Sequence, residues 1–200
     1  MNILAVDTAN ENMVIALLVE NKIYSRIGNL ESKKHNSLII PFIDEVLIDA
    51  KIDISQVDYF ACVVGPGSFT GIRIGVSSVN ALAFALGKKC VSITSLEEVA
   101  FDVKADDFYC AIDCRHNNFY YARFNNDFTN QIEIGEITLS ELEIKKNVVY
   151  KTKHSNPNSL IGIAKYKIQN NRFEKPSPLY LKKSQAEREY ESKNNMDNLG

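Results

Sequence analysis

Residues 58–75 of the chain read DYFACVVGPGSFTGIRIG. The apolar run Asp58–Val64 predicts a buried strand, and the glycine-rich loop Gly65–Gly71 predicts a turn into a helix that continues to about Leu86. A strand that passes through such a loop into a helix can present free backbone N–H groups to an anion. The candidate anion- or nucleotide-binding residues of the loop are therefore Gly65, Gly67, Ser68 and Thr70.

The loop differs from the known phosphate-binding motifs. A Walker A motif would end in Gly-Lys-Ser or Gly-Lys-Thr, but Gly71 is followed by Ile72 and Arg73. The dinucleotide fingerprint GxGxxG would need a glycine at Thr70. The alternative interpretation is a tight strand-to-helix turn in which Gly71 and Gly75 allow close packing.

A second candidate lies at the end of the first predicted strand. The apolar run Ile3–Val6 leads directly to Asp7 and Thr8. An aspartate in this position can contact a phosphate or a magnesium-bound water, whereas Asp-Thr is also a common turn. We therefore treat Asp7 and Thr8 as nucleotide-binding candidates and keep the turn as the alternative.

The first half of the chain alternates strands and helices. The predicted strands are Ile3–Val6, Met13–Val19, Lys22–Ile27, Asp58–Val64 and Cys90–Ile93, and the predicted helices are His35–Lys51, the helix that ends near Leu86, and one that begins at Ser95. Ser95 is the expected N-cap of that last helix, because Glu98 follows at the spacing of a capping box. The order βββαβαβα predicts an α/β fold with a mixed sheet flanked by helices.

The second half begins with another predicted strand pair, Phe108–Asp113 and Phe119–Phe124. A shift of 106 residues places Ala5, Asp7, Asn12 and Ala16 on Ala111, Asp113, Asn118 and Ala122. This match predicts an internal duplication, with an N-terminal lobe over residues 1–104 and a smaller C-terminal lobe over residues 105–200. The remaining predictions are a short helix near Ser140–Lys146, a strand at Val148–Thr152, a polar stretch at His154–Ser159 and a charged tail from Lys182.

Composition excludes several classes of protein. The 200-residue chain is 45% hydrophobic, and its net charge of -2 disfavours a protein that binds nucleic acid alone, because such proteins are usually basic. The four Cys and three His include no CxxC, HxxxH or HExxH pair, so we expect no metal site, although Cys110, Cys114 and His116 lie close together in sequence. No secretion signal is recognisable at the N-terminus, and no apolar run reaches the roughly 18 residues of a membrane span. We expect a cytoplasmic protein with no membrane association.

Two predicted helices carry more apolar surface than one core contact requires. Leu38 and Phe42 widen the apolar face of the first helix, and Phe84 continues a polar stripe along the second. Such an excess usually marks a partner surface, and the alternative is that the C-terminal half covers it within the chain. The predicted interface comprises Leu38, Phe42, Glu45, Arg73, Ser77, Asn80 and Phe84.

In these motifs the chain resembles the TsaB (YeaZ) family. The residues that carry the resemblance are Ile3-Leu-Ala-Val-Asp-Thr8, His35 six residues before Pro41, the run from Gly65 to Gly75, Ser95-Leu-Glu97, Asp113-Cys-Arg115 and Pro178-Leu-Tyr-Leu-Lys182. The resemblance implies an actin/sugar kinase/Hsp70-like (ribonuclease H-like) fold with two lobes, mixed sheets and flanking helices. The second lobe is shorter than is typical, so we expect it to be reduced.

The resemblance also implies a function. Family members support the formation of N6-threonylcarbamoyladenosine (t6A) beside the anticodon of tRNA, as non-catalytic paralogues of the transferase TsaD. They pair with TsaD through the first two helices, form homodimers in a similar way, and are joined by a TsaE-like ATPase. We therefore expect no catalytic residue in this chain, contact with tRNA only through the complex, and no cofactor, with ATP or ADP held on the partner.

Two other functions stay open at this point. A small ATP-binding enzyme of the same fold would use Asp7, Thr8 and the glycine loop, although Ala9 stands where the family commonly has serine. A peptidase would fit the old glycoprotease label of the family. The catalytic paralogue holds its metal through an HxxxH pair, which this sequence lacks.

Overall fold

The computed structural model describes residues 1–29, 35–151 and 155–182. Its elements are β1 (Ile3–Asp7), β2 (Asn12–Val19), β3 (Lys22–Asn29), α1 (His35–Ala50), a 3-10 turn (Ile54–Gln56), β4 (Tyr59–Gly65), α2 (Phe69–Leu86), β5 (Lys89–Thr94), α3 (Ser95–Ala100), β6 (Ala105–Asp113), β7 (Asn118–Asn126), β8 (Gln131–Thr138), α4 (Leu139–Glu143), β9 (Val148–Tyr150) and α5 (Pro157–Gln169). The predicted charged tail from Lys182 lies almost wholly outside the described residues.

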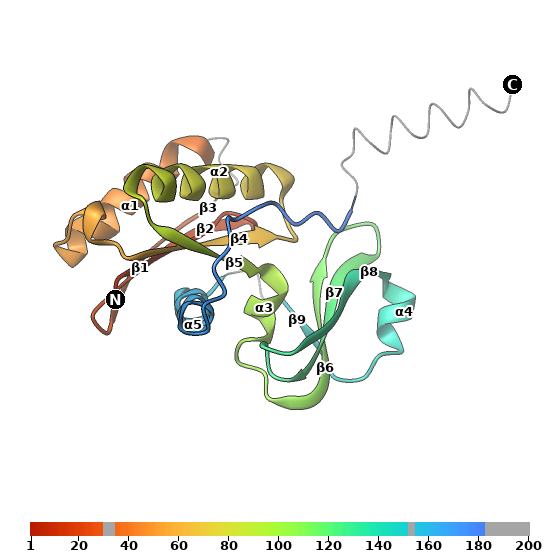
Figure 1. The fold of residues 1–200 in the computed structure, drawn as a ribbon. Coiled ribbons are helices and arrows are strands. Elements are labelled where there is room, and N and C mark those ends of the chain that lie inside the picture. The colour runs from red at the N-terminus through yellow and green to blue at the C-terminus, as the bar shows by residue number, and fades with distance from the viewer. Residues whose placement is uncertain (30–34, 152–154, 183–200) are drawn as a thin grey trace, which may run out of the picture.

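The strands form two mixed sheets with the same arrangement (Figure 1). The first sheet has the order β3-β2-β1-β4-β5, and the second has the order β8-β7-β6-β9. In the first sheet β1 runs antiparallel to β2 and parallel to β4. In the second sheet β6 likewise runs antiparallel to β7 and parallel to β9. The predicted α/β fold with a reduced second lobe is confirmed, since the second sheet has one strand fewer.

Most of the core lies around the first sheet, which helices cover on both faces. Figure 1 shows α1 and α2 on one face of this sheet and α5 on the other. All five residues of β1 are buried, as is almost every residue of β2. A strand covered on both faces needs apolar side chains on both, which explains why these strands read as continuous apolar runs.

The turn after the first strand is built in the same way in both sheets. Asp7 Oδ1 accepts a hydrogen bond from the Ala9 N–H at 2.7 Å, and Asp113 Oδ1 accepts one from the Arg115 N–H at the same distance. Asn12 and Asn118 then open the second strand of each sheet. This local identity, together with the shared strand order, supports the predicted internal duplication.

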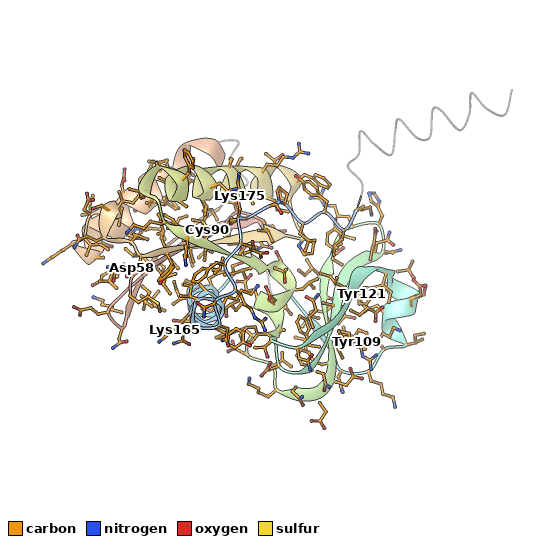
Figure 2. All side chains as sticks on the ribbon, in the orientation of Figure 1. Asp58, Cys90, Tyr109, Tyr121, Lys165 and Lys175 are labelled. Atoms are coloured by element: carbon orange, nitrogen blue, oxygen red, sulfur yellow. The ribbon has the colours of Figure 1, made fainter. Side chains whose placement is uncertain are left out.

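The chain returns to the first sheet after completing the second. Helix α5 packs on β1, β2 and β5, and residues 173–182, which we call the C-terminal strap, run past β5 and α2 (Figures 1 and 2). The Glu174 N–H donates to the Cys90 carbonyl at 3.1 Å, and the Leu179 N–H donates to the Val64 carbonyl at 2.8 Å. The boundary near residue 104 thus separates the two sheets, whereas α5 and the strap lie against the first.

Sequence patterns missed two elements, β8 and α5. Strand β8 is largely exposed and rich in glutamate, so it lacks the apolar run that predicts a strand. Helix α5 begins within the stretch 154–159, whose polar residues are typical of a loop. Its start signals are present: Asn156 caps the helix by accepting the Asn158 N–H, and Pro157 occupies the first position.

The predicted cap of α3 is wrong by one residue. Thr94, not Ser95, is the N-cap: its hydroxyl accepts the Glu97 N–H at 3.0 Å, and Glu97 accepts the Thr94 N–H at 2.7 Å. Ser95 and Glu98 have the same spacing as this pair, so the sequence could not discriminate between them. The shift leaves the Glu98 carboxylate available for other contacts.

A buried ion pair connects α5 to α3. Lys167 Nζ lies 2.7 Å from Glu97 Oε1 and donates to the Ser92 carbonyl at 2.7 Å. Both side chains are almost fully buried, at 11% and 13% exposure. Because a buried charge left without its partner is costly, this pair stabilises the docking of α5.

We expect Lys167→Met to lower the free energy of unfolding by about 3 kcal/mol, because it leaves the Glu97 carboxylate buried without its cation. Lys165, two residues earlier on the same helix, is exposed and is labelled in Figure 2. Lys165→Met is the matched control, expected to change stability by less than about 0.5 kcal/mol. Urea denaturation measures both, and equal stabilities would contradict a stabilising role for the pair.

Candidate functional site

The Asp7 side chain is fully buried and forms hydrogen bonds within the chain. Its Oδ1 accepts the Ala9 N–H at 2.7 Å, and its Oδ2 accepts from the Asn10 amide at 2.5 Å and from the Ser155 hydroxyl. The neighbouring Thr8 hydroxyl donates to the Gly71 carbonyl at 2.6 Å. Both predicted nucleotide-binding residues are therefore engaged by the protein itself.

The glycine loop packs directly on the turn that contains Thr8 and Ala9. A Cβ on Gly67 would lie 2.2 Å from the Ala9 carbonyl oxygen, and one on Gly71 would lie 1.8 Å from the Thr8 carbonyl oxygen. A Cβ on Gly75 would lie 2.3 Å from the Thr8 hydroxyl. Glycine is required here by close packing, as the alternative interpretation of the loop predicts.

Two N–H groups of the loop have partners inside the chain. The Ser68 N–H donates to the Ala9 carbonyl at 2.8 Å, and the Gly71 N–H donates to the Ser68 hydroxyl at 3.2 Å, which makes Ser68 the N-cap of α2. Gly65 lies against the strap, since a Cβ there would be 2.7 Å from the Leu179 carbonyl oxygen. Thr70 is exposed. The structure thus brings the loop and Asp7-Thr8 together, and nucleotide binding at this place stays a prediction.

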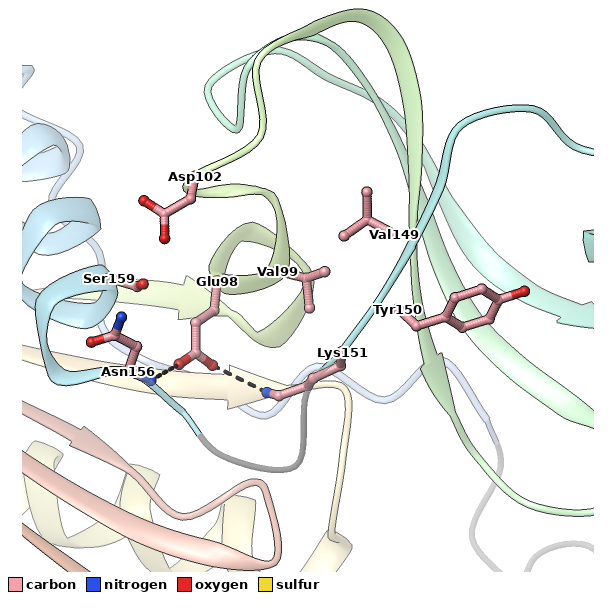
Figure 3. A pocket seen from close by; sticks show the side chains of 8 residues that line it. All are labelled: Glu98, Val99, Asp102, Val149, Tyr150, Lys151, Asn156 and Ser159. Carbon is pink, nitrogen blue, oxygen red and sulfur yellow. Dashed lines mark hydrogen bonds and ion pairs between the residues drawn. The ribbon is translucent and has the colours of Figure 1, made fainter.

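A pocket lined by α3, β9, α5 and adjoining residues holds a cluster of polar groups that the sequence did not predict (Figure 3). Its volume is about 220 Å³, and its lining residues are Glu98, Val99, Asp102, Val149, Tyr150, Lys151, Asn156 and Ser159. Glu98 is 8% exposed and accepts hydrogen bonds from Lys151 Nζ at 3.1 Å and from the Asn156 N–H at 3.0 Å. Burial raises the pKa of the Glu98 carboxyl above its ordinary value, Lys151 opposes this, and Asp7 adds to it.

Along α1, the predicted interface residues are partly engaged within the chain. Phe42 packs on β3, where a Cβ on Gly28 would lie 2.6 Å from its ring. Glu45 forms an ion pair with Arg26 at 2.6 Å. Leu38 and Phe42 are half-buried, while Ile48, which was not predicted, is 73% exposed.

Along α2, the strap covers part of the predicted stripe. Arg73 Nε donates to the Tyr180 hydroxyl at 2.8 Å, and the Asn80 amide donates to the Pro176 carbonyl at 2.8 Å. Ser77 is exposed, and Phe84 is the most exposed large apolar side chain among the described residues, at 89%. The strap therefore contacts Arg73 and Asn80 of the stripe and leaves Phe84 exposed.

No group of three or more His, Cys, Asp or Glu side chains among the described residues could hold a metal ion. Cys110 is fully buried in β6, and burial raises the pKa of its thiol to about 12. Cys114 is half-buried, with its Sγ 3.8 Å from Glu136 Oε1. Cys110 therefore packs as a small buried side chain.

Comparison with known proteins identifies the family. A family model described as "TsaD: tRNA N6-adenosine threonylcarbamoyltransferase" matches residues 18–184. A "tRNA threonylcarbamoyladenosine biosynthesis protein TsaB" of Buchnera aphidicola subsp. Schizaphis graminum is 31% identical over 72% of this chain and 70% of its own length. The chain belongs to the TsaB family.

A TsaB protein of Haemophilus influenzae is 35% identical over 62% of this chain, and the match spans about half of that relative's length, 53%. The structure described as "YeaZ from Pseudomonas aeruginosa" superposes with a TM-score of 0.73 at 22% identity, covering 90% of this chain and 99% of that one. This likeness shows that the TsaB-family chain shares the YeaZ fold.

Helix α2 is the one described segment long and apolar enough to cross a membrane by length and composition. Core helices pass the same test, and α2 packs on the first sheet through Ile72, Val76 and Val79. The length and composition of α2 are therefore weak evidence for a membrane span.

We expect Gly71→Ala to lower the free energy of unfolding by about 3 kcal/mol, because the added methyl group would collide with the Thr8 carbonyl and push α2 away from β1. Thr70→Ala, on the exposed side of the same turn, is the control and should change stability by less than about 0.5 kcal/mol. Thermal and urea unfolding check both variants. A stable Gly71→Ala protein would show that the contact with Thr8 can relax.

Proposed function

We propose that this chain is a non-catalytic subunit of the machinery that forms t6A in tRNA. The observation that carries the proposal is membership of the TsaB family, whose relatives at 31–35% identity are named tRNA threonylcarbamoyladenosine biosynthesis proteins. The subunit acts by docking on a TsaD-like transferase and stabilising its active conformation. The transferase supplies the reacting groups and most of the contact with tRNA.

The surface of the first lobe supports a docking role. Phe84 on α2 is 89% exposed, and Ile40 and Ile48 on α1 are 48% and 73% exposed. Aromatic side chains in the centre of an interface commonly contribute most of its binding energy, because they bury a large area with few rotatable bonds. The same helices would serve a homodimer when the partner is absent.

The polar groups of the first lobe support a non-catalytic role. Asp7, Thr8 and two N–H groups of the glycine loop are engaged inside the chain rather than aimed at an open site. We expect a TsaE-like ATPase to join the complex, with ATP or ADP bound by the partner subunits. We place the protein in the cytoplasm, where tRNA is modified.

Reconstitution with the TsaD-like and TsaE-like partners tests the proposal. Formation of t6A should require this chain, and Phe84→Glu should weaken pairing with the transferase at least about 30-fold, because a desolvated charge replaces an apolar anchor. Ile144→Glu, an equivalent change at a 78% exposed residue of the second lobe, is the matched control. Size-exclusion chromatography reads out pairing and tRNA nucleoside analysis reads out t6A; modification that proceeds equally without this chain would refute the proposal.

Calorimetry with ATP and Mg²⁺ separates this function from that of a small ATP-binding enzyme. The isolated chain should give no binding heat, because Asp7 already accepts three hydrogen bonds and α2 packs closely on the Thr8 turn. An Asp7→Asn variant is the control for any heat observed. Saturable binding that Asp7→Asn abolishes would favour the enzyme.

A further inference from the structure

The Ser155 hydroxyl lies between two buried carboxylates. It contacts Asp7 Oδ2 through a short hydrogen bond and Glu98 Oε2 at 3.0 Å, and it accepts from the Asn10 amide at 2.9 Å. A serine hydroxyl has one proton to donate. With both carboxyl groups ionised, one of the two oxygen–oxygen contacts therefore has no proton between its atoms.

The charges of the cluster do not balance when both carboxyl groups are ionised. Asp7 is fully buried, Ser155 is 3% exposed and Glu98 is 8% exposed. Among the described residues, Lys151 is the one cation in contact with the cluster, with its Nζ 3.1 Å from Glu98 Oε2 (Figure 3). Two carboxylates and one ammonium leave one negative charge among largely buried groups, which is unfavourable.

The cluster joins both sheets of the molecule. Asp7 ends β1 of the first sheet, and Lys151 follows β9 of the second, with its N–H donating to the Ala111 carbonyl of β6 at 2.9 Å. Glu98 belongs to α3, which packs against strands of both sheets, and Ser155 precedes α5. A change in the hydrogen bonds of this cluster therefore acts on the contact between the lobes.

We propose that Asp7, Ser155 and Glu98 form a buried site that binds one proton and thereby stabilises the contact between the two lobes. The proton comes from solvent and forms an O–H bond on the Glu98 carboxyl, which donates to Ser155 Oγ. Ser155 then donates its own proton to Asp7, so both contacts are hydrogen bonds. The net charge of Asp7, Glu98 and Lys151 changes from -1 to 0, because the bound proton cancels one carboxylate.

The charged groups that face Glu98 support placing the bound proton on its carboxyl. Of the described residues, Asp7 approaches from β1 and Lys151 from the end of β9, while Asp102 lies one turn further along the chain at the pocket rim and is exposed. Cys62 of β4 lies beside Asp7 as a neutral thiol, because burial raises its pKa far above the ordinary value. Burial, with the charge of Asp7, outweighs the opposing effects of Lys151 and of the Ser155 hydrogen bond and raises the pKa of Glu98, which favours its protonated form.

The sign of the effect on stability follows from proton uptake. A carboxyl whose pKa is higher in the folded chain than in the unfolded chain stabilises the fold below its ordinary pKa of 4.5, and this stabilisation is lost as pH rises through the folded value. We expect the urea midpoint of the full chain to fall as pH rises from the ordinary glutamate pKa of 4.5 through the higher folded value.

Glu98→Gln tests the site directly. The neutral amide can donate to Ser155 and accept the Asn156 N–H at any pH, so the pH dependence of the urea midpoint should flatten. The quantity compared is the slope of the urea midpoint against pH. The midpoint itself is not compared, because the variant also leaves Lys151 without its carboxylate and so changes stability at every pH. Asp102→Asn, which removes the exposed carboxyl of the same pocket, is the matched control and should keep the wild-type slope.

If Glu98→Gln fails to fold, carboxyl ¹³C NMR of the full wild-type chain tests the proton site instead. One glutamate resonance should titrate above the ordinary range, and Lys151→Met should move that titration to higher pH, because the opposing cation of the second lobe is lost. The proposal is overturned if every glutamate titrates in the ordinary range, if Lys151→Met leaves the titration unmoved, or if Glu98→Gln retains the wild-type slope.

Discussion

The close approach of Gly71 to the Thr8 carbonyl sets the position of α2 in this molecule. A Cβ at residue 71 would lie 1.8 Å from that oxygen, so only a glycine lets the helix begin so near the end of β1. The Thr8 hydroxyl, bonded to the Gly71 carbonyl at 2.6 Å, holds the two segments at this distance. Ile72, Val76 and Val79 then pack the helix on the first sheet, and Phe84 is left exposed.

Contacts with the first lobe and with α5 support the small second lobe. Helix α3 lies at the junction and carries two adjacent glutamates with different partners. Glu97 pairs with Lys167 of α5, and Glu98 pairs with Lys151 at the end of β9. The C-terminal strap adds a further link, since Lys182 Nζ lies 2.8 Å from Glu136 of β8. These polar contacts add to the apolar core that residues of both sheets share.

Patterns in the sequence predicted the elements whose signals are local. The strands of the first sheet, the glycine-loop turn and the duplicated Asp turns all depend on neighbouring residues, and the structure has each of them. Strand β8 lacked an apolar run, and α5 begins in a polar stretch, so their apolar contacts with the rest of the fold were not recognised. Of the candidate site, Asp7, Thr8 and the loop were predicted and lie together. Glu98 and Ser155 were not, because 57 residues separate them and Ser155 lies 148 residues from Asp7.

The sequence by itself determined the fold class, the family and the glycine that the α2 turn requires, because these depend on short motifs and local periodicity. The tertiary structure alone decided which polar groups have partners inside the chain. It showed Asp7 bonded to Ser155, part of the α2 stripe covered by the strap, and Phe84 left exposed. The physical reason is that burial and pairing arise from contacts between segments far apart in sequence, and no local pattern encodes those distances.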